Sequence, residues 1–160
     1  MTYTFADFAG KFPPVPMPAT LGEATHHVFS TENEPLPDAM ILQFILPNEP
    51  DTAAGDPYTE YVPCFTIDDT DHFIALVWWK AELMNYEYVL ATYTGNGALI
   101  DRKVIAYTRI RGDKIQRAVA TINEDWEIFI AAGDAGTDDA FDPTSSHTYD
   151  LEIMADGTIQ

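Results

Sequence analysis

Turn signals recur about every ten residues in the second half of the chain, and this spacing constrains the fold most. They stand at Gly95-Asn96-Gly97, Arg111-Gly112-Asp113, Asn123-Glu124-Asp125 and Ala155-Asp156-Gly157. Glycine and asparagine accept the positive φ that tight turns require. The residues between the turns are rich in β-branched and aromatic types, and polar and apolar residues partly alternate. Short strands at this spacing predict an antiparallel sheet folded as a sandwich or a barrel-like body.

The expected fold is all-β: an antiparallel meander that forms a sandwich or a partly closed, blade-like curled sheet. We expect strands over residues 40–46, 58–67, 73–80, 86–94, 98–107, 114–122, 126–132, 149–154 and 158–160. Pro63 indicates an edge or a bulge in its strand, because proline has no N–H to donate to a neighbouring strand. Residues 73–80 are dense in aromatic and branched side chains, which is typical of a buried central strand. Residues 133–147 are rich in Gly, Asp, Pro and Ser, and they predict a loop.

The N-terminal segment, residues 1–37, is rich in proline and has little periodicity. Residues 12–18 carry four prolines and are expected to run extended along the body, with Phe12, Val15 and Met17 packed against it. Recognition of this polyproline stretch by a partner is the alternative. A short helix is expected near residues 6–12. The 160 residues suit a single domain, 1–160, made of this proline-rich extended segment and a β body over 40–160.

Several strand and turn residues also carry a resemblance. They are Phe73-Ile74-Ala75-Leu76, Tyr88-Val89-Leu90-Ala91-Thr92-Tyr93, Gly97-Ala98-Leu99-Ile100-Asp101, Tyr149-Asp150-Leu151-Glu152-Ile153 and Asp156-Gly157-Thr158-Ile159. Over about half of its length the chain resembles small uncharacterised bacterial β-meander proteins. The resemblance implies a meander fold and no activity or site residues.

The formal net charge of −18 limits the classes of binding partner that are plausible for this chain. Nucleic acid and anionic membranes are disfavoured, because both bind through lysine and arginine. Basic proteins and cations remain plausible partners. Six of the eight basic residues cluster between positions 102 and 117: Arg102, Lys103, Arg109, Arg111, Lys114 and Arg117. The cluster indicates solvated strands that pair with acidic neighbours, and the alternative is a local anion site.

The location is expected to be cytoplasmic. The N-terminal residues lack the basic start and the apolar stretch of a secretion signal, and no apolar run approaches the roughly 18 residues that span a membrane. The single cysteine, Cys64, cannot form an internal disulfide, in agreement with a reducing compartment.

No catalytic or cofactor motif stands out. Cys64 is expected to be a buried, inert thiol, and no serine lies in a Gly-x-Ser-x-Gly context. His26 and His27 are adjacent, so a strand would point them to opposite sides, and His72 and His147 stand alone. We therefore expect no metal centre, no cofactor and no enzymatic activity.

Acidic and aromatic residues supply the candidate contacts. Calcium could be held by Asp68, Asp69 and Asp71, or by the segment from Asp134 to Asp142 with Asp138 and Asp139, although solvated turns explain both. The adjacent Trp78 and Trp79 must face opposite sides of a strand, so one is core and the other is covered by a further layer or lies on a binding surface. One candidate contact patch is therefore Trp78, Trp79, Asp68, Asp69 and Asp71.

Two function classes follow. The first is a non-enzymatic acidic protein-binding module, such as an inhibitor or immunity-type protein that covers a basic partner. The second is a small-molecule or carbohydrate-binding protein, or a weak hydrolase, with an aromatic and carboxylate cleft. A flat or convex acidic face with exposed aromatics would favour the first class, and a concave pocket with tryptophan and several acids would favour the second. A homodimer formed through a sheet edge is a further prediction.

Overall fold

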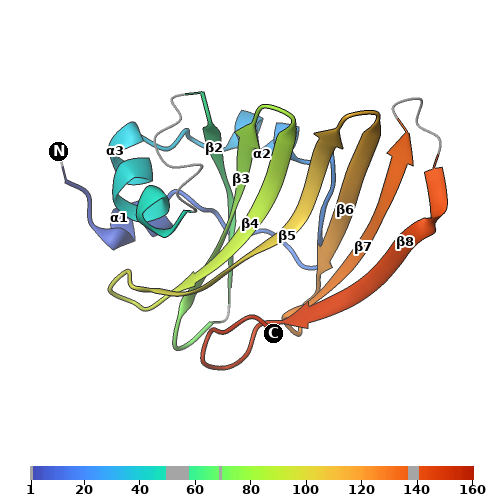
Figure 1. Ribbon diagram of the computed structural model, residues 1–160. Helices are drawn as coiled ribbons and strands as arrows, with labels where there is room; N and C mark the ends of the chain where they lie inside the picture. The colour runs from blue at the N-terminus through green and yellow to red at the C-terminus, as the bar shows by residue number, and fades with distance from the viewer. Residues whose placement is uncertain (1, 50–57, 69, 137–140) are drawn as a thin grey trace.

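One antiparallel meander dominates the computed structural model, which describes residues 2–49, 58–68, 70–136 and 141–160. Its strands follow one another in chain order from β2 to β8, and the sheet curls without closing (Figure 1). The strands are β2 (Glu60–Ile67), β3 (Ile74–Glu82), β4 (Asn85–Tyr93), β5 (Leu99–Arg111), β6 (Lys114–Ile122), β7 (Glu127–Gly136) and β8 (Phe141–Glu152). The expected all-β curled meander is confirmed.

Strands β3 and β4 are buried on both faces. Trp79 and Tyr88 pair across the two strands and point into one hydrophobic cluster. Trp78 and Val89 also pair, and they point into a second cluster on the opposite face. This double burial explains why both strands read as nearly continuous apolar runs, because neither face has to meet water. The prediction that Trp78 and Trp79 face opposite sides is confirmed.

The N-terminal part of the chain supplies both covers (Figure 1). On the Trp78 side pack α1 (Phe5–Ala9), α3 (Asp38–Met40) and the irregular helical turns η1 (Ile41–Ile45) and η2 (Leu46–Asn48), through side chains that include Phe8, Met40 and Ile45. On the Trp79 side pack β1 (Ala19–Leu21) and α2 (His26–Glu32), with Leu21 and Phe29 in the cluster. The expected packing of Phe12, Val15 and Met17 against the body is confirmed.

Strand β1 enters the sheet where β5 and β6 separate. β5 pairs with β6 only from Tyr107↔Ala118 to Arg111↔Lys114, next to their connecting turn. Further along β6, β1 takes the place of β5 and pairs Leu21 with Ala120. The chain then leaves the sheet at Gly22 and begins α2 four residues later. This places the start of α2 beside β3, β4 and β5, at the strand ends that lie next to the point where β5 and β6 separate.

One strand predicted from the sequence is absent. Residues 40–46, predicted as a strand, are helical. Met40 and Ile45 are buried while Leu42 is exposed, so the burial is one-sided with a helical period. A short apolar run does not by itself separate a strand from a buried helical segment. The segment 1–37 is extended around its prolines, and the short helix expected near residues 6–12 is present as α1, whereas α2 was not predicted.

The loop predicted over residues 133–147 is wrong as well, because its described residues, 133–136 and 141–147, are strand. Gly133 pairs with Arg117, and Asp134 pairs with Asp142, so β7 and β8 continue through much of this polar stretch. β8 is an edge strand, and residues 146–150 are all exposed. The backbone ladder therefore extends without the apolar alternation that sequence analysis needs to recognise a strand.

A buried ion cluster joins the Trp78 side of the sheet to the end of the N-terminal cover. The Glu49 carboxylate is fully buried and accepts from Lys80 Nζ at 2.6 Å and from Arg102 Nη2 at 2.8 Å. Lys80 is also buried, and its ammonium lies 3.2 Å from Glu82. Glu49 is thus the carboxylate that Lys80 and Arg102 share, and the more exposed Glu82 contacts Lys80 alone, which makes the cluster sensitive to loss of Glu49.

Replacement of Glu49 by glutamine is therefore expected to lower the free energy of unfolding by about 3 kcal/mol, because it leaves buried cations poorly compensated. Urea denaturation followed by tryptophan fluorescence measures this loss. The matched control is Glu34→Gln, since Glu34 makes a pair of similar length with Lys11, 2.7 Å, at the surface. The control should leave the urea midpoint unchanged. Equal midpoints for the two variants would contradict the role assigned to Glu49.

Candidate functional site

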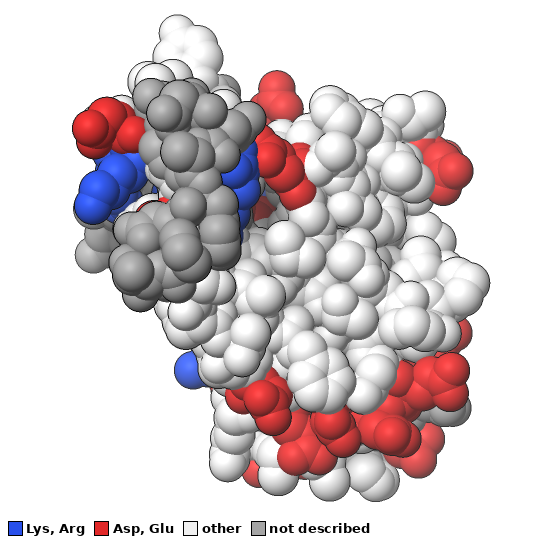
Figure 2. Space-filling model, turned by 90° about the vertical axis from the view of Figure 1, so that its right-hand side faces the viewer, with Lys and Arg blue, Asp and Glu red and all other residues white. Residues whose placement is uncertain are grey.

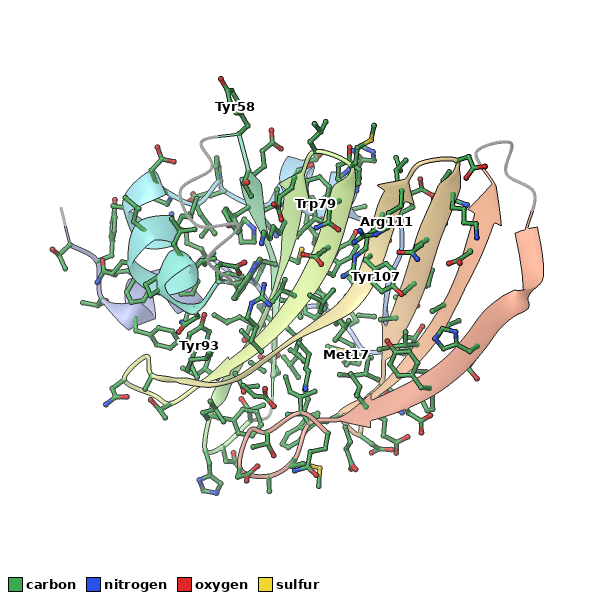
Figure 3. The ribbon with its side chains drawn as sticks, in the orientation of Figure 1. Met17, Tyr58, Trp79, Tyr93, Tyr107 and Arg111 are labelled. Carbon is green, nitrogen blue, oxygen red and sulfur yellow. The ribbon has the colours of Figure 1, made fainter. Side chains whose placement is uncertain are left out.

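An aromatic pocket of about 490 Å³ lies where β1 leads into α2. Its walls come from the β1–α2 connection and the start of α2, from β3 and β4, and from β5 and β6 beside their split. The lining residues are Gly22, Glu23, Ala24, His26, His27, Trp79, Tyr86, Tyr88, Tyr107, Thr108, Ile110 and Ala118. Figure 3 shows Trp79 near the upper end of β3 and Tyr107 on β5. The pocket is referred to below as the aromatic pocket.

Three flat rings are stacked along one wall of the aromatic pocket. The His26 imidazole lies parallel to Trp79, with ring centroids 4.0 Å apart and an interplanar angle of 3°. Tyr86 is parallel to Trp79 at 6.0 Å and 7°. Trp79 is buried, whereas His26 and Tyr86 are only partly buried. His26 and Tyr86, the outer rings of the stack, are therefore accessible to a ligand, and the indole of Trp79 holds both in place.

His26 is held as a neutral hydrogen-bond acceptor. Its Nδ1 lies 2.9 Å from the Glu23 backbone carbonyl, and a carbonyl can only accept, so Nδ1 carries the proton. Burial lowers the pKa of His26 below its ordinary value, and the neighbouring His27 lowers it further. The Glu23 carbonyl and Glu60 oppose this shift without reversing it. At neutral pH the Nε2 lone pair of His26 is therefore available as an acceptor.

Two tyrosines are fixed by polar contacts. The Tyr88 hydroxyl donates to the Gly22 carbonyl at 2.9 Å, which ties β4 to the end of β1. Burial raises the pKa of the Tyr88 phenol, so it stays neutral. The Arg109 guanidinium lies 4.0 Å from the centre of the Tyr107 ring and donates to Glu87 at 2.7 Å. Because Tyr107 pairs with Glu87 and Arg109 with Asn85 across β4 and β5, these side chains lie on the face of the sheet opposite to Tyr86 and Tyr88.

The predicted contact patch is not brought together. Trp78 is buried in the core beneath α1 and α3, whereas Trp79 lines the aromatic pocket. Asp68 and Asp71 are exposed and lie between β2 and β3, at the end of β3 opposite to Trp79. Five residues of strand separate Ile74 from Trp79, about 17 Å. Asp69 lies outside the described residues.

The remaining sequence candidates lie elsewhere. Cys64 is fully buried, and burial raises the pKa of its thiol, as expected for an inert cysteine. Within the described part of the chain, no three His, Cys, Asp or Glu side chains are grouped to hold a metal ion. Asp134 belongs to β7, and Asp138 and Asp139 lie outside the described residues. None of the described helices is long and apolar enough to cross a membrane.

Half of the basic cluster forms ion pairs with acidic residues that are distant in sequence. Arg102 pairs with Glu49, Arg109 with Glu87, and Arg117 with Glu23. The first two pairs are partly or fully shielded from solvent, and the third lies at the rim of the aromatic pocket. These contacts support the interpretation of the cluster as partners for acidic neighbours rather than as an anion site.

Sequence analysis missed most of the pocket. His26 and His27 were read as if on a strand, but they begin α2, and their ring centroids lie 4.0 Å apart. Tyr86, Tyr88 and Tyr107 were visible as aromatics, yet nothing in their spacing placed them beside the histidines. The long-range pairing of β1 with β6 brings these segments together, and β1 has only three residues. Such a strand leaves no periodic signal.

Comparisons with known proteins found no match among family models, curated proteins or solved structures. The resemblance to bacterial β-meander proteins therefore gains no support from them, and the site must be interpreted from its own chemistry.

His26 is expected to protonate at a lower pH in the native protein than in the unfolded chain. Between the two pKa values the native protein binds fewer protons than the unfolded chain. The contribution of His26 to the free energy of unfolding is therefore fully present above the pKa of the unfolded chain, and it is lost as the pH falls through the lower pKa of the native protein. Titration of the His26 ring by NMR, in buffer and in urea, measures both values. A native pKa equal to or above the unfolded value would contradict the burial of this ring against Trp79.

Proposed function

We propose that this protein binds a small organic ligand in the aromatic pocket and acts as a binding protein. The observation that carries the proposal is a cavity of about 490 Å³ beside the stacked rings of His26, Trp79 and Tyr86, with Tyr88 and His27 also among its lining residues. Pockets for small molecules usually measure roughly 300 to 1,000 Å³, and aromatic side chains with a few polar groups line them. The aromatic pocket has this size and this composition.

The polar groups of the pocket suit binding better than catalysis. Glu23 is the single carboxylate among the described lining residues, and it is paired with Arg117 at 3.0 Å. A glycosidase-like mechanism needs two carboxyl groups across the substrate. The lining residues include neither a cysteine nor a serine. The geometry therefore favours the binding alternative over the weak hydrolase.

Ligand binding is tested with variants that remove one ring each. Tyr86→Leu and His26→Leu each remove one of the two rings stacked on Trp79 and should each reduce affinity for a pocket ligand about tenfold, because a stacking surface is lost. A thermal-shift screen of small ring compounds, followed by calorimetry, identifies the ligand and measures the loss. Tyr58→Leu is the control, because Tyr58 is 88% exposed and does not line the pocket.

The pocket proposal fails if no compound raises the melting temperature of the parent protein. It also fails if a compound binds with the same affinity to the parent and to both pocket variants.

Binding of a basic protein is the second candidate, favoured by one face of β6, β7 and β8. Val119 and Phe129 are 40% and 47% exposed there. Asp150 pairs with Phe129, and Glu127 lies directly opposite Glu152. Like charges opposite each other cost stability in a sheet, and a basic partner would relieve that cost. Figure 2 shows acidic side chains gathered on the β8 side of the molecule next to an uncharged area.

This second function predicts capture of one basic protein at low salt and its release at high salt, because electrostatic association weakens with ionic strength. Phe129→Ser and Glu152→Lys should abolish the capture, and Tyr86→Leu should preserve it. Capture that is insensitive to Phe129→Ser and Glu152→Lys would exclude this face as the contact.

A further inference from the structure

The two edge strands of the sheet differ in how their backbone groups are used. At one edge β2 is covered, because its Thr66 N–H donates to the Pro13 carbonyl at 3.1 Å and the Asn33 amide donates to two β2 carbonyls at 2.7 and 2.9 Å. At the other edge, no described strand lies beside residues 146–150 of β8, and all five are exposed (Figure 1). The fold thus closes one edge of the sheet and leaves the other open to a further strand.

The pairing of β8 fixes which of its backbone groups point outward. Glu152 exchanges both of its backbone hydrogen bonds with Gln160, at 2.7 and 2.9 Å, and therefore points away from β7. Alternate residues of an antiparallel strand point to the same side, and the register between β7 and β8 does not shift over this stretch. Asp150, Thr148 and Ser146 therefore also point outward. Each of these three residues presents one N–H and one C=O, and no described residue forms a hydrogen bond with them.

Carboxylates without a counter-charge stand beside this row of backbone groups. Asp150 and Glu152 share a face of the sheet with Glu127, because Glu127 lies directly opposite Glu152. None of the three forms an ion pair with a described basic residue, whereas Glu23 and Glu49 do. Figure 2 faces this side of the molecule and shows acidic side chains gathered below an uncharged area. A strand that docks on β8 therefore meets uncompensated negative charge on one of its faces.

We propose that β8 binds an extended, basic segment of a partner protein, which adds to the sheet as a further strand. The inference rests on the second function proposed above and gives its mode of contact. An antiparallel segment with residues opposite Asp150, Thr148 and Ser146 exchanges backbone hydrogen bonds with them. A lysine or arginine opposite Asp150 lies on the face that carries Glu152 and Glu127, so the charge attraction and the backbone pairing favour the same register.

A basic segment suits this edge better than a second copy of the chain. Each copy carries a net charge of −18, so pairing of two β8 strands brings like charges together. The position opposite Glu152 is also already filled by Gln160. In the symmetric antiparallel register centred on Thr148, the part of the second β8 that precedes Ser146 would run into Gln160. A partner segment that begins opposite Asp150 avoids this overlap.

Synthetic peptides test the mode of contact, with binding measured by fluorescence anisotropy. The probe is a short peptide of alternating lysine and valine with blocked ends, and its glutamate–valine counterpart should not bind. Methylation of the lysine backbone nitrogens should weaken binding about tenfold, because the acidic face sets the lysines opposite Asp150 and Thr148, where their N–H groups pair with β8. Methylation of the valine backbone nitrogens, which point away from β8, leaves the charge unchanged and should weaken binding by less than about twofold.

Thr148→Pro tests the same edge from the side of the protein. Proline removes the outward N–H of residue 148 and keeps the bonds between β7 and β8, so binding of the lysine peptide should fall about tenfold. Thr148→Val keeps this N–H and is the matched control. Urea denaturation of both variants checks that the sheet is intact, and the methylated peptides decide the question if Thr148→Pro does not fold.

Equal binding of the two methylated peptides would overturn strand addition. If Glu152→Lys then weakens both peptides and Glu32→Lys does not, a basic partner contacts the acidic face through side chains alone, and the second function stands. Glu32→Lys makes the same change of net charge at the far end of α2.

Two further results would overturn the proposal. The first is the absence of binding by any lysine peptide, and the capture at low and high salt then decides separately whether a basic protein binds. The second is a dimer of the parent protein in sedimentation that Thr148→Pro dissociates, because the edge would then belong to a second copy of the chain.

Discussion

The burial of β3 and β4 on both faces is the constraint on which the rest of the structure depends. A meander alone covers neither face of its central strands, so their apolar runs require two further layers. Residues 2–49 provide both layers, with α1, α3 and η1 against Trp78 and with β1 and α2 against Trp79. The N-terminal segment is thus part of the core rather than an appendage to a β body.

The aromatic pocket follows from the way in which one of these layers is attached. β1 reaches the sheet by pairing with β6 where β5 has moved away, and the chain must then leave the sheet to form α2. The Tyr88 hydroxyl donates a hydrogen bond to the carbonyl of Gly22, where the chain leaves the sheet, and His26 stacks on Trp79. The cover therefore touches the sheet through rings and leaves a cavity beside them. A ligand that fills the cavity would contact both the cover and the sheet.

Sequence analysis predicted the parts of the fold that depend on local signals. The turns at Gly97, Gly112 and Gly157 have the positive φ that glycine favours, and the bulge next to Pro63 is present. It failed where tertiary packing decides, as in the helical segment around Met40 and Ile45, whose apolar run suits a strand or a helix. The same limit applied to the site. Trp79 was identified as a candidate, but its stacking partner His26 comes from a segment distant in sequence.

The most direct test of the account is NMR mapping, on the isotope-labelled protein, of a ring compound that raises the melting temperature of the parent protein. The account predicts that the largest shift changes fall on the indole N–H of Trp79 and on the amides of residues 22–27 and 107–110, with little change on β7 and β8. Shift changes spread over the acidic face of β7 and β8, with none at Trp79, would show that the compound binds outside the aromatic pocket. That result would contradict the assignment of the aromatic pocket as the binding site.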